Sequence, residues 1–417
     1  MTEHSEATLS EPSVRDRLLA AHRSGGLLAG ISEILRVGGL RADAVAEELV
    51  ILHNDGTIDV VEAFSRLDKR EDGFSFFQTR SVFERALPHI DADVITTIRT
   101  VRHLVNQAGD DLAAGFTLRS LESFLAREPA RPSSALSEIQ AHPELHDLVP
   151  TALLAGWQID PETYVQEALD LTSAENPDMR RQAVFALGRI QWSDKNRPPA
   201  AAYAALERIV GQEADDKLLA VTATTAAHLL EQDPAHTELL IGLIDGAIEK
   251  GGDHATHAAA RLLAEEATPD ALVLRLLAHI RRVNPQHKGT VGQIDDALSR
   301  LLVRGKADVT LEALTGMLKE GVLEPDALGS VLHVLRSQKT LVSKAVTKWL
   351  LDGDPPVCRM AAMLVGDARG MDLPCEVDVA EIDMTDSRAV VFLARKVCGY
   401  FFMNPLTGVR QWMGTRG

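Results

Sequence analysis

The feature that most constrains how this sequence can fold is a helical hairpin that recurs along its second half. Turn signals recur at intervals of about 35–40 residues, and each is followed by two amphipathic segments with helical apolar spacing. A single helical hairpin cannot bury its apolar stripe, whereas stacked hairpins bury theirs against one another. The spacing therefore predicts an α-solenoid, with a compact helical bundle as the alternative. Predicted hairpin starts lie near Asp215, Asp253, Lys288, Glu324 and Asp354.

The clearest copies of this unit are two stretches that lie 178 positions apart, "NPDMRRQAVFALG" from Asn176 and "DPPVCRMAAMLVG" from Asp354. Each opens with a residue type that caps helix N-termini, followed by a proline suited to the first helical position. A shared alanine would let a neighbouring helix approach closely. Arg181 aligns with Arg359, so we expect both to serve the repeat. Arg180 has no counterpart, and we expect it to be a free surface charge.

The Asn/Asp-Pro-x-x-x-Arg-x-x-Ala pattern of residues 176–183 and 354–361 resembles the first helix of a HEAT repeat, in the HEAT/armadillo-like superfamily. The family often has valine just before the arginine position, where Arg180 and Cys358 stand here. The resemblance covers about half of the chain, residues 161–368. It implies an all-α fold, a solenoid of HEAT-like hairpins with a helical N-terminal region and an atypical C-terminal cap, and it implies nothing about activity.

These patterns predict four segments: a disordered N-terminus (1–11), a helical region (12–130), the repeat solenoid (131–370) and a C-terminal segment (371–417). The polar stretch from Ala126 to Glu138, with its prolines, is the expected boundary between the two helical regions.

The helical region could hold either diverged repeats or a separate domain. We expect its helices within residues 24–39, 41–54, 57–68, 91–107 and 112–128, with Thr57 and Asp91 as two of the starts.

Charge argues against general binding to a phosphate backbone. The formal net charge is −17, and no long segment is basic overall. One local strip of cations is the exception. It serves either to offset the dipoles of helix C-termini or to bind a phosphate or an acidic partner. The strip extends to Lys306 and contains the candidate binding residues Arg275, Arg281, Arg282, Lys288, Arg300 and Arg304.

The C-terminal segment concentrates aromatic residues. A helix is expected over Asp386–Phe402, and the last 18 positions hold Tyr400, Phe401, Phe402 and Trp412. These aromatics either cap the final repeat or dock a partner.

No motif for catalysis stands out. The sequence lacks Walker A, G-x-G-x-x-G, G-x-S-x-G and H-E-x-x-H patterns, and it lacks the His-Glu dipeptides of the HEAT-like deoxyhypusine hydroxylases. We therefore predict no catalytic residues, no metal site and no cofactor. The predicted function is a non-enzymatic scaffold or adaptor for a protein partner. Two alternatives remain open: a nucleic-acid-associated accessory subunit that uses the Arg275–Lys306 strip, and a divergent HEAT-like enzyme.

The cysteines and the N-terminus predict a cytoplasmic protein with no membrane partner. Cys358, Cys375 and Cys398 form no C-x-x-C pair, which favours reduced thiols. The N-terminus is polar and acidic, unlike a signal peptide, and no apolar run approaches the roughly 20 residues that span a bilayer.

Overall fold

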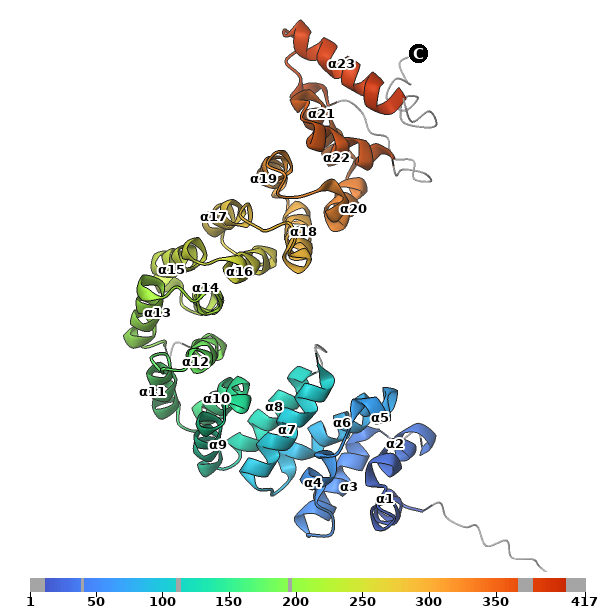
Figure 1. Cartoon of the computed structure of the whole chain (residues 1–417), viewed down its shortest axis with the longest axis vertical. Coiled ribbons are helices and arrows are strands. Elements are labelled where there is room, and N and C mark those ends of the chain that lie inside the picture. Colours follow the sequence, from blue (N-terminus) through green and yellow to red (C-terminus); the bar gives the residue numbers. More distant parts are fainter. Residues whose placement is uncertain (1–11, 39–40, 110–113, 194–196, 367–377, 403–417) are drawn as a thin grey trace, which may run out of the picture. The chain divides into compact units, whose positions relative to one another are not determined.

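The protein is all-helical, as predicted. The computed structural model describes residues 12–38, 41–109, 114–193, 197–366 and 378–402, and no β-strand occurs in these ranges. The chain folds into two compact units, residues 1–191 and 192–417 (Figure 1). The predicted limits of the four segments stay predictions, and the expected disorder of residues 1–11 lies outside the described residues.

Short and long helices follow one another through the first unit. They are α1 (Val14–Arg23), α2 (Leu27–Gly38), α3 (Ala42–Asn54), α4 (Val60–Phe64), α5 (Lys69–Asp72), α6 (Phe74–Ala86), η1 (Leu87–His89), α7 (Val94–Ala108), α8 (Ala114–Ala126), α9 (Ala130–Ala141), η2 (Pro143–Leu148), α10 (Val149–Ile159), α11 (Pro161–Leu171) and α12 (Pro177–Arg189).

Each hairpin start predicted in the second unit, near Asp215, Asp253, Lys288, Glu324 and Asp354, lies within five residues of the first residue of an α-helix. The helices of this unit are α13 (Ala200–Gln212), α14 (Asp216–Gln232), η3 (Pro234–His236), α15 (Thr237–Lys250), α16 (Asp253–Ala264), α17 (Asp270–Ile280), α18 (Lys288–Val303), α19 (Ala307–Lys319), η4 (Pro325–Ala327), α20 (Gly329–Ser337), α21 (Lys339–Asp352), α22 (Pro355–Gly366), η5 (Val379–Glu381) and α23 (Ser387–Phe402).

Helices of the second unit alternate between two rows. In one row α14 packs on α16, α16 on α18 and α18 on α20; in the other, α13, α15, α17, α19 and α21 pack in the same order (Figure 1). The first unit repeats this arrangement, with α6, α8, α10 and α12 in one row and α4, α7 and α9 in another. Helices in these rows therefore contact the helices one hairpin before and after them, in addition to their neighbours in sequence, such as α15 on α14.

Polar contacts keep the same spacing in both units. Among the described residues, the side-chain hydrogen bonds that link distant positions span from 27 positions (Arg336 to Met363) to 43 positions (Lys396 to Gly353). Arg15 and Asp55 in the first unit and Lys250 and Val210 in the second are both 40 positions apart. Hydrogen bonding, like apolar packing, thus joins each hairpin to its sequence neighbour.

Helix starts follow the predicted capping chemistry. The Asn176 side chain accepts hydrogen bonds from the backbone N–H groups of Asp178 (2.8 Å) and Met179 (3.2 Å), with Pro177 at the first helical position. Ala183 and Ala361 are both fully buried, as expected of small residues at a helix contact.

Two predicted starts are wrong by two residues. Asp93, not Asp91, caps α7 by accepting from Thr96 N–H (2.8 Å), and Asp59, not Thr57, caps α4. In both cases the capping side chain is the aspartate directly before the first helical residue, where it reaches the N–H groups of the first turn.

The prediction of a free Arg180 is also wrong. Its guanidinium donates to the backbone oxygens of Ala174 (3.0 Å) and Glu175 (3.2 Å), in the turn that leads into α12. The two aligned arginines differ as well. Arg359 forms an ion pair with Asp326, a whole hairpin away, whereas Arg181 pairs with Asp178 inside its own helix.

The stretch from Ala126 to Glu138, expected as a polar boundary, is mostly helical. Arg131 in α9 is buried because its guanidinium lies 4.1 Å from the Phe124 ring centre and donates to the Phe124 carbonyl oxygen (3.0 Å). The charged side chain of Arg131 is therefore part of the packing between α8 and α9.

Asp216 shows how one hairpin caps the next. Its carboxylate, at the start of α14, accepts from the backbone N–H groups of Gly252 (2.7 Å), His254 (2.8 Å) and Ala255 (3.0 Å) at the start of α16. Burial pushes the pKa of Asp216 upward, but the three N–H donors outweigh it and hold the pKa below its usual value.

We predict that Asp216→Ala lowers the free energy of unfolding by about 1 kcal/mol at neutral pH, the typical cost of a lost helix cap. Because the folded pKa is depressed, the stabilisation is present above the unfolded pKa of about 4 and is lost as pH falls through the folded pKa. Urea titrations from pH 7 to pH 3 should show the difference between wild type and variant shrinking with acid. A constant difference at every pH would contradict this account.

Candidate functional site

The first half of the predicted basic strip is engaged with neighbouring hairpins. Arg275 forms an ion pair with Asp245 (Nη1 to Oδ2, 2.8 Å), and Arg281 reaches Glu320 (Nε to Oε2, 3.1 Å). Arg282 donates to the Glu249 carbonyl oxygen (2.9 Å) and to that of Ile248, at the C-terminus of α15. These cations offset a helix dipole or a carboxylate that lies 30 to 39 positions away.

The second half of the strip is mixed. Arg304 donates to the Glu265 carbonyl oxygen (2.9 Å), and Lys306 forms an ion pair with Asp270 (2.6 Å). The side chains of Lys288 and Arg300 have no hydrogen-bond or ion-pair partner among the described residues. The structure therefore does not bring the six candidates together as one set of unpaired cations.

The C-terminal aromatics lie at the edge of the described chain. Tyr400, Phe401 and Phe402 fall in the last turn of α23, without described side chains, and Trp412 lies outside the described residues. Helix α23 itself packs on α21. Its Phe392 ring occupies the space beside Gly353, where an added Cβ would come within 2.5 Å of the ring. Capping and docking both remain predictions for this segment.

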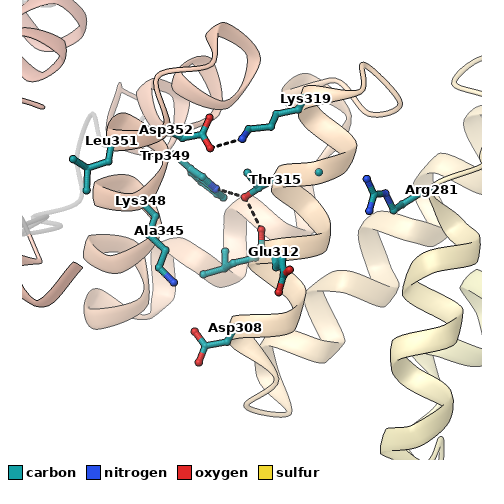
Figure 2. Close-up of a pocket in the computed structure, with 12 residues that line it drawn as sticks. Arg281, Asp308, Glu312, Thr315, Lys319, Ala345, Lys348, Trp349, Leu351 and Asp352 are labelled. Atoms are coloured by element: carbon teal, nitrogen blue, oxygen red, sulfur yellow. Dashed lines mark hydrogen bonds and ion pairs between the residues drawn. The ribbon is translucent and has the colours of Figure 1, made fainter. Parts of the chain in front are cut away.

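A groove with a volume of about 760 Å³ lies between α19 and α21 on the second unit. Each helix contributes side chains at intervals of three or four positions, which places them on one face. Figure 2 shows Thr315 and Lys319 of α19 pointing toward Trp349 and Asp352 of α21. The groove is lined by Arg281, Asp308, Leu311, Glu312, Thr315, Gly316, Lys319, Ala345, Lys348, Trp349, Leu351 and Asp352.

The floor of the groove is held by a hydrogen-bond relay. Trp349 is buried, and its indole Nε1 donates to Thr315 Oγ1 across the two helices (2.8 Å). Thr315 in turn donates to the Leu311 carbonyl oxygen one turn earlier (2.6 Å). Because a buried indole N–H is costly to leave unpaired, this relay fixes how α19 and α21 pack together.

An ion pair joins the two helices at each end of the groove. Lys344 Nζ, in the first half of α21, lies 2.6 Å from Asp308 Oδ1 at the start of α19. Lys319 pairs with Asp352 at the C-terminal ends of the two helices (Figure 2). The hydrogen bond from Lys344 lowers the pKa of Asp308, and Asp308 raises the pKa of Lys344. The two pairs show that α19 and α21 run parallel.

The rim of the groove carries both signs of charge. Glu312 is exposed and has no partner among the described residues, while Lys348 lies 3.4 Å from Glu381. Arg281 lies against Gly316, where an added Cβ would approach its guanidinium to 3.3 Å. The glycine thus lets Arg281 cross the helix surface to Glu320, whose carboxylate raises the pKa of the arginine.

Metal and membrane sites do not emerge within the described ranges. These ranges contain no group of three or more His, Cys, Asp or Glu side chains placed to hold a metal ion. None of their helices has the length and apolar character needed to cross a membrane.

Comparison with known proteins does not extend the resemblance to HEAT repeats. No family model matches the chain, and no curated protein matches it in sequence. The HEAT-like pattern of residues 176–183 and 354–361 therefore stays a resemblance.

The groove was not among the sites predicted from the sequence. The only local sign of the groove is that "LEALTG" and "KAVTKWLL" place polar or small residues beside apolar ones on the same face of a helix. The residues that matter come from helices about 34 positions apart (Thr315 and Trp349), and their pairing depends on how the hairpins stack.

We predict that Arg282→Gln lowers the free energy of unfolding by about 1 kcal/mol, because it removes charged hydrogen bonds to the α15 C-terminus. The matched variant Lys288→Gln, at an exposed cation with no described partner, should change it by less than about 0.5 kcal/mol. Chemical denaturation of the two variants checks this. Equal effects would mean that the Arg282 contacts do not stabilise the fold.

Proposed function

We propose that this chain is a non-enzymatic helical-repeat scaffold, and that it holds an extended segment of a protein partner in the groove between α19 and α21. The observation that carries the proposal is the groove itself, a hollow with a fixed floor that lies between two ion pairs. Three properties support it: the repeat, the length of the groove and the chemistry of its lining.

A HEAT-like solenoid within each unit is the finer fold that we propose. Its support is the packing of each helix on the helices one hairpin away, together with polar contacts that span one hairpin. The pattern at residues 176–183 and 354–361, which resembles HEAT repeats, lies at the starts of α12 and α22. Stacked repeats expose long rows of helices, which suit extended protein contacts.

The size of the groove fits a short peptide. Asp308 and Lys319, which belong to its two end pairs, are separated along α19 by about 16 Å at 1.5 Å per residue. An extended chain covers that length with about five residues. A groove of a few hundred Å³ or more is also in the range that encloses a ligand rather than a single side chain.

The chemistry of the groove supports binding rather than catalysis. Lys319, Asp352 and Asp308 are held in ion pairs, and Arg281 is bonded to Glu320, so these groups already have structural partners. Two exposed charges on the rim, Glu312 with no described partner and Lys348, which lies 3.4 Å from Glu381, can select the register of a partner segment.

The nucleic-acid alternative is less well supported than the scaffold. Most of its cations donate to carboxylates or helix C-termini of the same chain, so their charge is already offset. Only Lys288 and Arg300 of the strip, among the described residues, have no partner and could bind a phosphate backbone without breaking an existing contact.

A photo-crosslinker tests the proposal. We predict that benzoylphenylalanine at position 312 crosslinks to a partner protein in an extract of the native host, because this residue stands on the groove rim. The same group at position 288, which is exposed but away from the groove lining, is the matched control and should not give that adduct. The measurement is the set of adducts identified by mass spectrometry.

Competition sharpens the result. Excess unmodified wild type should abolish the position-312 adduct, whereas the charge-swapped variant Glu312→Lys/Lys348→Glu should compete at least tenfold less well. Identical adducts from positions 312 and 288, or equal competition by the two proteins, would contradict the groove. A nuclease-sensitive adduct would favour the nucleic-acid alternative.

A further inference from the structure

A second surface, on the first unit, carries exposed aromatic rings and arginines whose guanidinium N–H groups have no partner in the described chain. Phe116 on α8 is 55% exposed and Phe185 on α12 is 38% exposed. Arg119 lies over the Phe116 ring (4.7 Å to its centre) and Arg189 over the Phe185 ring (5.9 Å). Both arginines are exposed, one helical turn after their rings.

These residues belong to one row of helices. Helix α10 packs on α8 on one side and on α12 on the other (Figure 1). Gln158 of α10 donates to Glu122 of α8 (2.6 Å), which ties the middle of the surface together. Burial raises the pKa of Glu122, and the charges of Arg189 and Arg119 act in the opposite direction, so both arginines lie near this carboxylate.

Each of the two arginines stacks on an exposed ring and, within the described part of the chain, keeps its guanidinium unpaired. Neither Arg119 nor Arg189 has an ion pair or a side-chain hydrogen bond among the described residues. By contrast, the guanidinium of Arg131, which also stacks on a phenylalanine, is buried and paired with Glu128. A guanidinium stacked on a ring keeps its N–H edges available for a carboxylate.

Such a surface has the composition of a binding hot spot. Aromatic rings and arginine are enriched where protein interfaces gain most of their energy, and an exposed ring contributes little until a partner covers it. Two unpaired arginines beside two exposed rings are complementary to a segment that carries carboxylates and apolar side chains.

We infer that the α8–α10–α12 surface binds an acidic segment of a partner protein, with carboxylates at Arg119 and Arg189 and apolar side chains on Phe116 and Phe185. This surface is independent of the groove between α19 and α21. It lies in the other unit and shares no residue with the groove, so the failure of either proposal leaves the other standing.

A randomised peptide-display library tests the inference on the full-length chain. We expect the enriched peptides to combine Asp or Glu with Phe, Trp or Leu. Synthetic versions should bind at least tenfold more weakly to Arg119→Ala/Arg189→Ala and to Phe116→Ser/Phe185→Ser, measured by fluorescence anisotropy. Binding should also weaken as salt rises.

Controls separate this surface from others and from loss of fold. Arg119→Lys/Arg189→Lys keeps the charge but loses bidentate geometry, and should weaken binding by less than the alanine pair. Glu312→Lys/Lys348→Glu should bind within twofold of wild type, and circular dichroism should report unchanged helicity for every variant.

Four results would overturn the inference. The first three are no enrichment, enrichment of peptides without acidic residues, and equal binding to wild type and the Arg119→Ala/Arg189→Ala pair. The fourth is tighter binding of a single-stranded oligonucleotide that the same pair abolishes, since aromatic rings and arginines also stack on bases.

Discussion

The structure depends on one constraint: a helical hairpin cannot bury its own apolar face. Each hairpin therefore packs on the next, and in both units helices one hairpin apart contact each other beside the contacts between consecutive helices. The polar contacts follow the same rule, because a side chain on one hairpin lies beside the helix ends of the next. Asp216 caps the start of α16, and Lys250 donates to the Val210 carbonyl oxygen near the end of α13 (2.5 Å).

This constraint also decides which charges are free for function. A cation on one hairpin is within reach of carbonyls and carboxylates of the adjacent hairpin, so Arg275, Arg282 and Arg304 link neighbouring hairpins. Functional surfaces are to be sought where this pairing is incomplete. The rim of the α19–α21 groove has Glu312, and the α8–α10–α12 surface has Arg119 and Arg189.

The helices could be predicted from the sequence, because apolar spacing and turn residues act locally. In the second unit, the predicted hairpin starts and the helix expected over Asp386–Phe402 lie within five residues of observed helices. The stretch from Ala126 to Glu138 is predicted as a boundary because of its prolines, but Pro129 and Pro132 lie at the N-cap and in the first turn of α9, where proline is tolerated. The groove was beyond prediction for a different reason. Trp349 and Thr315 come into contact only after the hairpins stack. In the same way, the sequence of the basic strip does not reveal which carboxylates of the neighbouring hairpins pair with its cations.

Hydrogen–deuterium exchange of the Asp295→Ala variant tests most directly whether each hairpin is stabilised by its contacts with the neighbouring hairpins. The Asp295 carboxylate is buried in α18 and accepts from Ser330 N–H (2.8 Å) and Val331 N–H (2.9 Å) at the start of α20. The account predicts that the variant loses amide protection in α18, α20 and the helices packed on them, while α1 to α8 keep wild-type protection. An equal loss of protection in every helix of both units would contradict it.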